Sequence, residues 1–190
     1  MFNLQEFRNK FQNGGARPSQ FEMQVIWPAA VRGTAGVAAA ERDFSFLCNM
    51  AQIPKSEIGV MNVPYFGRTM KFAGDRKFED LNVTVLNDED YKVRHAIEAW
   101  MKAIRDHATT TSVFNGGIDS GSYVTDGVVK QFSPNNGGAP LHAYKFVGMF
   151  PTLLGDIKLS WAAEGQVEEF TVTFAYQWWE AVNASTGAAL

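Results

Sequence analysis

The sequence predicts a mainly β protein: an antiparallel β-sandwich or partial barrel flanked by one α-helix at about residues 89–107. Three observations predict this fold. Several stretches alternate apolar and polar residues with the period of two that is typical of half-buried strands. Only one long stretch carries apolar residues at the three- and four-residue steps of a helix. Aromatic residues, which are enriched in β cores, make up 13% of the chain.

The chain of 190 residues is long enough for one domain with a substantial core. We therefore expect residues 1–190 to form a single domain. We also expect an N-terminal arm at about 1–18, a long irregular loop at about 109–142 and a flexible C-terminal tail at about 183–190.

The N-terminal arm carries apolar residues in a loosely helical rhythm ahead of the breaker Gly14-Gly15. These residues are Phe2, Leu4, Phe7 and Phe11. Such a short segment cannot bury these side chains by itself. We therefore expect them to pack against the rest of their own domain or against a neighbouring subunit.

Two alternating stretches follow the arm, and both are predicted to be strands. They lie at 21–26 and 43–50, and the small residues at 29–40 between them suggest a loop. Cys48 falls on the aromatic face of the second stretch. No histidine lies near it in sequence to activate the thiol, so we interpret Cys48 as a buried apolar residue.

The middle of the chain predicts three short strands at 58–63, 65–68 and 70–73, followed by a turn at 74–76. A better-defined strand at 78–86 then alternates apolar and polar side chains.

The predicted helix comes directly after this strand. Its apolar residues fall on one stripe, at Val93, Ile97, Trp100, Met101 and Ile104. Asn87 or Asp88 is placed to cap its first turn by accepting hydrogen bonds from free amides.

The C-terminal third of the chain predicts strands at 144–150, 157–161 and 168–178, with a turn at 151–155. The last strand has the most regular alternation, with large aromatic side chains on one face and short polar ones on the other. We leave open whether this polar face lines a wetted barrel or is the solvent side of a sandwich.

Charge and composition exclude several classes of function. With 17 basic and 20 acidic residues the net charge is −3, and no cluster of Lys or Arg occurs, so tight nucleic-acid binding is not expected. No apolar run approaches a membrane span, and the N-terminus shows no signal-peptide pattern. One cysteine excludes an intrachain disulfide, and we expect synthesis in a reducing cytoplasm.

No catalytic or metal-binding pattern is recognisable. His95, His107 and His142 stand apart from one another and from Cys48, and the acidic run 88–90 is explained by its place at a helix start. We therefore expect no catalytic residue, no metal ligand and no cofactor. A different class stays open: a monomeric β-sandwich that binds a small ligand through its aromatic face.

Four segments together resemble the tail tube protein family of contractile-tailed, T4-like bacteriophages. The resemblance is one of pattern along most of the chain, in the family's order, with no single diagnostic motif. The segments are 15–25, 58–66, 70–88 running on into the helix, and 146–152 with 170–176.

The resemblance implies a structural protein, not an enzyme. It implies hexameric rings that stack helically into a hollow tube, with each subunit adding strands to a larger barrel around the lumen. The implied partners are other copies of the chain, a tail sheath protein, a tape-measure protein, a baseplate or tube initiator, and DNA passing through without sequence-specific binding. The implied location is a virion tail made in the bacterial host cytoplasm. Phage-derived bacteriocins and secretion-type injection devices use similar tubes, and that alternative stays open.

Two sets of residues acquire roles from this resemblance together with the strand pattern. One set is expected to line the lumen, although the opposite assignment, toward the sheath, also stays open: Glu169, Thr171, Thr173, Gln177, Asn82 and Thr84. The second set is expected to make contacts between subunits: Phe2, Leu4, Phe7, Phe11, Asn135 and Asn136.

Overall fold

The computed structural model describes residues 3–11, 15–34, 37–107, 123–133, 138–183 and 188. The described part is mainly β, which confirms the predicted fold class. Its elements are, in order, α1 (Leu4–Lys10), β1 (Phe21–Val25), α2 (Ala29–Arg32), α3 (Val37–Leu47), β2 (Cys48–Ala51), β3 (Ser56–Tyr65), β4 (Arg68–Phe78), β5 (Leu81–Leu86), α4 (Lys92–Ile104), β6 (Thr125–Phe132), β7 (Pro140–Leu154), β8 (Glu169–Ala175) and β9 (Trp178–Val182).

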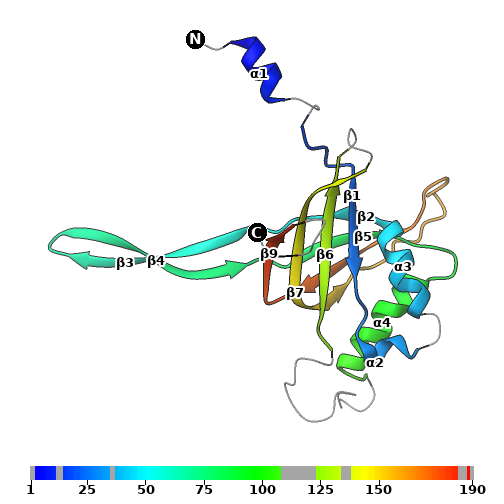
Figure 1. Ribbon diagram of the computed structural model, residues 1–190. Helices are drawn as coiled ribbons and strands as arrows, with labels where there is room; N and C mark the ends of the chain where they lie inside the picture. The colour runs from blue at the N-terminus through cyan, green and yellow to red at the C-terminus, as the bar shows by residue number, and fades with distance from the viewer. Residues whose placement is uncertain are drawn as a thin grey trace.

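Seven strands form one curled sheet. Six of them pair side by side in the order β1-β6-β7-β8-β5-β2, and the seventh, β9, pairs with β7. All the pairings are antiparallel. The two ends of the path, β1 and β2, lie near each other, so the sheet closes most of a barrel. Helices α2, α3 and α4 lie together at one side of this barrel (Figure 1).

The barrel interior is filled with aromatic side chains. The largest fully buried residues are Trp27, Trp100, Phe44, Phe146, Phe170 and Phe174. The Trp27 and Trp100 rings meet edge to face with centroids 5.5 Å apart, a geometry that aromatic pairs favour. The aromatic face that could have held a ligand is therefore packed inside the core, which argues against the ligand-binding alternative.

Helix α4 confirms the predicted helix, although it begins three residues later than expected. Its buried stripe consists of Val93, Ala96, Ile97 and Trp100. The N-cap position is occupied by Tyr91, not by Asn87 or Asp88, but Asp88 Oδ1 accepts a hydrogen bond from the Lys92 amide of the first turn at 3.1 Å.

The predicted strand at 43–50 and the predicted loop at 29–40 are both wrong. Residues 29–32 form α2, and α3 takes up residues 37–47 before the short β2 begins. Val37, Ala40 and Phe44 are buried at steps of three and four along α3, which is the helical period. The alternation that suggested a strand was fortuitous.

Strands β3 and β4 form a separate two-stranded hairpin that extends far beyond the barrel (Figure 1). The turn predicted at 74–76 is wrong, because β4 runs through it and the hairpin reverses at Phe66-Gly67, where both residues have positive φ. Gly74 instead lies where the strands approach closely: a Cβ there would come within 3.1 Å of the Gly59 carbonyl oxygen.

The last predicted strand, 168–178, is two strands. β8 ends at Ala175, where it pairs with Phe150 of β7, and β9 begins at Trp178, which pairs with Val147 of the same strand. The Gln177 amide donates to the Val147 carbonyl oxygen at 3.0 Å, so the chain stays bonded to β7 through the break between β8 and β9.

Two further boundaries differ from prediction. β7 continues through the expected turn at 151–155 as far as Leu154, and the expected strand at 157–161 belongs to an irregular segment, 155–168. The range 109–142, expected to be one long loop, contains β6 and the start of β7. Residues 108–122 and 134–137 lie outside the described residues.

Candidate functional site

A polar surface covers the outside of β5 and β8. Their core-facing residues alternate with polar ones that point away from the barrel interior. The register sets Asn82 opposite Thr173 and Thr84 opposite Thr171, with Glu169 next along β8. Thr173 Oγ1 donates a hydrogen bond to Asn82 Oδ1 at 2.8 Å. We call these five residues the polar β5–β8 face.

Five of the six residues predicted to line a lumen therefore come together on one surface. Gln177 does not join them, because it follows the end of β8 at the turn toward β9. Sequence periodicity alone gave no signal of that break.

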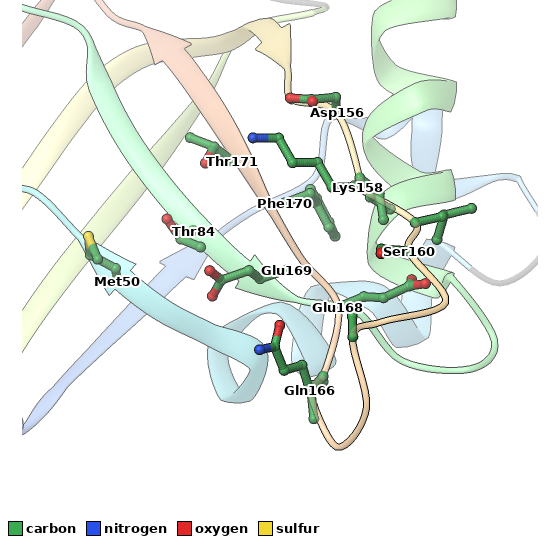
Figure 2. Close-up of a pocket in the computed structure, with 15 residues that line it drawn as sticks. Met50, Thr84, Asp156, Lys158, Ser160, Gln166, Glu168, Glu169, Phe170 and Thr171 are labelled. Atoms are coloured by element: carbon green, nitrogen blue, oxygen red, sulfur yellow. The ribbon is translucent and has the colours of Figure 1, made fainter.

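A groove of about 570 Å³ separates one end of the polar β5–β8 face from the irregular segment 155–168 (Figure 2). The Lys158 side chain reaches over this groove toward Thr171, and Glu169 lies beside Thr84. The segment is therefore folded back over the sheet instead of running freely away from it.

The start of segment 155–168 is fixed to α4 and β8. Arg94 Nη1 donates to the Gly155 carbonyl oxygen at 3.2 Å, and the Gly155 amide donates to the Thr171 carbonyl oxygen at 2.7 Å. A Cβ on Gly155 would meet that same Thr171 oxygen at 2.8 Å, so only glycine fits without a shift of the backbone.

The end of segment 155–168 is fixed through Glu168. Its Oε2 accepts hydrogen bonds from Asn87 Nδ2 and from the Tyr91 hydroxyl, both at 3.0 Å. Hydrogen bonding to this carboxylate is the main cause that raises the pKa of Tyr91 above its ordinary value. Both ends of the segment are thus anchored to α4 or to the turn that precedes it.

Removing the Glu168 carboxylate is expected to loosen this anchor. We expect Glu168→Ala to lower the free energy of unfolding by about 1–3 kcal/mol, because hydrogen bonds to a charged, partly buried group are lost together. Urea denaturation followed by tryptophan fluorescence measures the change. Glu164→Ala, on the same segment but exposed, is the control and should stay within about 0.5 kcal/mol of the parent. Equal values for the two variants would contradict the anchoring role.

The middle of the anchored segment exposes large apolar side chains. Leu159 is 78% exposed, Val167 67% and Trp161 fully exposed. Together with the exposed Glu164 we call these residues the 159–167 patch. The alternation of Leu159 and Trp161 suggested a strand in the sequence, but no described part of the chain buries the apolar side chains of the patch.

The β3–β4 hairpin carries a second exposed apolar surface. Val63 pairs with Met70 and Met61 with Phe72 across its two strands, and every one of these side chains is about half exposed. The exposed apolar residues of the hairpin are Ile58, Val60, Met61, Val63, Tyr65, Phe66, Met70 and Phe72. A two-stranded ribbon cannot bury its apolar side chains against a second layer of structure. An exposed apolar surface of this size is typical of a site that binds another protein.

Helix α1 is a third exposed apolar surface, and it lies away from the barrel (Figure 1). Leu4, Phe7 and Phe11 are between 53% and 74% exposed. The described part of the chain therefore leaves these predicted contact residues uncovered. The other predicted contacts, Phe2, Asn135 and Asn136, lie outside the described residues.

Within the described residues, no group of three or more His, Cys, Asp or Glu side chains is arranged to hold a metal ion. No helix among them is long and apolar enough to cross a membrane. The prominent surface features of the described residues are the exposed apolar side chains of the hairpin, of α1 and of the 159–167 patch.

Comparison with known proteins agrees with this character. A family model described as phage tail tube protein matches residues 16–182. The tail tube protein gp19 of Enterobacteria phage T4 is 26% identical over 171 residues, which cover 90% of this chain and 94% of that protein. The tail tube protein of Serratia phage KSP90 is 25% identical over 178 residues, which cover 93% of this chain and 95% of that protein.

Solved structures of contractile injection systems share the fold. A chain from the PVC sheath/tube terminator in its extended state gives a TM-score of 0.62 at 11% identity, covering 89% of this chain and 97% of that one. A chain from the anti-feeding prophage baseplate gives a TM-score of 0.59 at 12% identity, covering 90% of this chain and 97% of that one.

Proposed function

This chain belongs to the phage tail tube protein family, and we propose that its copies form hexameric rings that stack helically into the hollow inner tube of a contractile tail. The observation that carries this proposal is the β3–β4 hairpin, a long apolar ribbon that no described segment of its own chain covers. Association with other copies buries such a ribbon, and different surfaces meeting head to tail build open stacks. We infer that the role is structural and not catalytic.

We further propose that residues 1–190 act as one tail-tube unit. In the assembled tube, the arm at 1–18, the 109–142 region and the C-terminal tail at 183–190 extend as contacts to neighbouring copies. The exposed apolar residues of α1 support this for the arm, because a ring or stack of subunits would cover them.

The polar β5–β8 face is proposed to line the lumen. Its own side chains are neutral or acidic, and the one basic group near it among the described residues is Lys158, which reaches over the neighbouring groove toward Thr171. A lining with so little positive charge lets DNA pass without holding its phosphates. Closing the barrels of neighbouring subunits into a ring also protects sheet edges, such as β1 and β2, that one copy leaves unpaired.

The partners that follow are a tail sheath, a baseplate or tube initiator, and a tape-measure protein within the lumen during assembly. One structural neighbour comes from a sheath-tube complex and another from a baseplate. The named relatives are phage proteins, which favours a virion tail over a bacteriocin or secretion device. Synthesis then takes place in the host cytoplasm.

Thiol labelling of assembled tubes tests the lumen assignment. We expect Thr171→Cys to react with a bulky maleimide polymer in the free subunit and to be protected in tubes, because the polymer cannot enter a narrow channel. Arg42→Cys, on the exposed surface of α3, is the matched control and should react in both states. The native Cys48 adds little background, because burial raises the pKa of its thiol to about 12.

The reverse labelling pattern, with Thr171→Cys reactive and Arg42→Cys protected in tubes, would place the polar β5–β8 face toward the sheath and contradict the lumen assignment.

A further inference from the structure

We propose that the tip of the β3–β4 hairpin of one copy docks on the 159–167 patch of a second copy. This inference rests on the proposed tube function and names the two surfaces that meet along the stack. The hairpin tip is defined here as residues 60–74.

The two surfaces lie at opposite ends of the barrel. β5 joins them: the chain enters it from the hairpin at Leu81, and its other end, Leu86, pairs with Glu169 beside segment 155–168. Six residues of strand separate these ends by about 16 Å. Figure 1 shows the hairpin leaving one side of the barrel while segment 155–168, in orange, lies on the other.

This placement favours a stack. Because the hairpin tip and the 159–167 patch are different surfaces, their contact is heterologous: after two copies bind, one keeps a free hairpin tip and the other keeps a free patch. Repeating the contact therefore extends an assembly without ending it.

Both surfaces expose large aromatic side chains, as the centres of protein–protein interfaces do. Tyr65 is 62% exposed and Phe66 90%, at the turn of the hairpin, while Trp161 is fully exposed on the patch. Aromatic residues of this kind provide most of the binding energy at protein interfaces. The patch is also held at both ends by Arg94 and Glu168, so docking requires little additional ordering of it.

Charge sets which surface pairs with which. Between Val60 and Gly74 the hairpin tip carries Arg68 and Lys71 and no acidic residue. Between Leu159 and Glu169 the opposite end of the barrel carries acidic residues and no basic one.

The acidic residues are Glu164, Glu168 and Glu169, and Lys158 borders them. Glu168 is already bound by Asn87 and Tyr91, which leaves Glu164 and Glu169 available. Neither these two nor Arg68 and Lys71 form an ion pair with another described residue. Complementary charge of this kind fixes orientation and register when copies meet.

Charge reversal tests the pairing directly. The hairpin variant carries Arg68→Glu with Lys71→Glu, and the patch variant carries Glu164→Lys in the patch with Glu169→Lys at the adjoining end of the polar β5–β8 face. Each is expected to lower the amount of tube formed at a given concentration by at least about tenfold, because like charges then face each other. Sedimentation and negative-stain microscopy, with growth seeded on a baseplate complex, measure the yield. Arg42→Glu, a matched reversal on α3, should assemble like the parent.

The chain carrying all four substitutions decides the question, since it restores opposite charges across the contact. We expect it to recover most of the lost yield. Failure to recover, or parent-like assembly of both double variants, would overturn the pairing while leaving the tube function standing.

A parent protein that forms no tube even when seeded would instead overturn the proposed function, and the pairing with it. Trp161→Ala gives an independent check, because it removes the aromatic centre of the patch without reversing charge. It should lower the yield of tubes and leave the melting temperature unchanged.

Discussion

A chain whose hairpin is cut back to a short turn is expected to fold and to form no tubes. The design replaces residues 60–74 with Asn-Gly and keeps the hairpin base. Barrel stability should survive, because β3 and β4 pair only with each other and not with the seven-stranded sheet. Phe78 remains in place to pack against Tyr176 and Trp179. Assembly should be lost because the variant lacks most of the exposed apolar surface of the hairpin.

Circular dichroism with thermal melting tests the fold of the shortened chain, and seeded sedimentation tests its assembly. Phe46→Ser is the control, since it removes an exposed aromatic side chain from α3, on the helical side of the molecule. We expect that control to assemble. Normal tubes from the shortened chain would show that the hairpin is dispensable and remove the main support for the proposed function.

Trp100→Ala is expected to have the largest effect on folding. Trp100 is fully buried, its Nε1 donates to the Tyr123 carbonyl oxygen at 2.8 Å, and its ring contacts those of Trp27 and Phe174. Truncating such a residue leaves a cavity and removes the hydrogen bond to Tyr123, which together lower the free energy of unfolding by about 3–5 kcal/mol. That is a large share of the roughly 5–15 kcal/mol that holds a domain together.

Trp161→Ala is the matched control for folding. It removes the same side chain from a site where it is fully exposed, so the free energy of unfolding should change by less than about 0.5 kcal/mol. Chemical denaturation of both variants measures the difference. Similar losses at the two sites would mean that the packing around Trp100 does not hold the barrel together.

The spacing of apolar residues predicted correctly those elements that bury one face and expose the other. β5 and α4 were predicted together, because each packs one face on the core and exposes the other. It failed for α3, where small residues at 38–40 weaken the helical signal and a chance alternation at 43–50 imitates a strand.

The apolar residues at 157–161 show a different limit of the method. Leu159 and Trp161 alternate with polar residues as in a strand, but they lie on an irregular segment and face outward. The hairpin presents the same problem, since its apolar pattern is the same whether its own chain or another copy covers it. The sequence shows only that these side chains are apolar. The structure is needed to show that the described part of the chain does not bury them.

The polar β5–β8 face was the part of the site most accessible to prediction. Its residues alternate strictly with buried residues along β5 and β8. Pairing of these two strands therefore brings five of the six residues predicted to line the lumen onto one surface. The exception, Gln177, could not be predicted, because the break between β8 and β9 involves a backbone hydrogen bond to Val147 of β7, a residue distant in the sequence.

A cryo-electron microscopy reconstruction of tubes grown from the purified protein on a baseplate seed tests the central claim most directly. The account predicts stacked sixfold rings around an open channel, with Thr84, Thr171 and Thr173 facing that channel and each hairpin tip seated on a neighbouring copy. A reconstruction in which α3 and α4 face the channel while the hairpins project freely into solvent would contradict it.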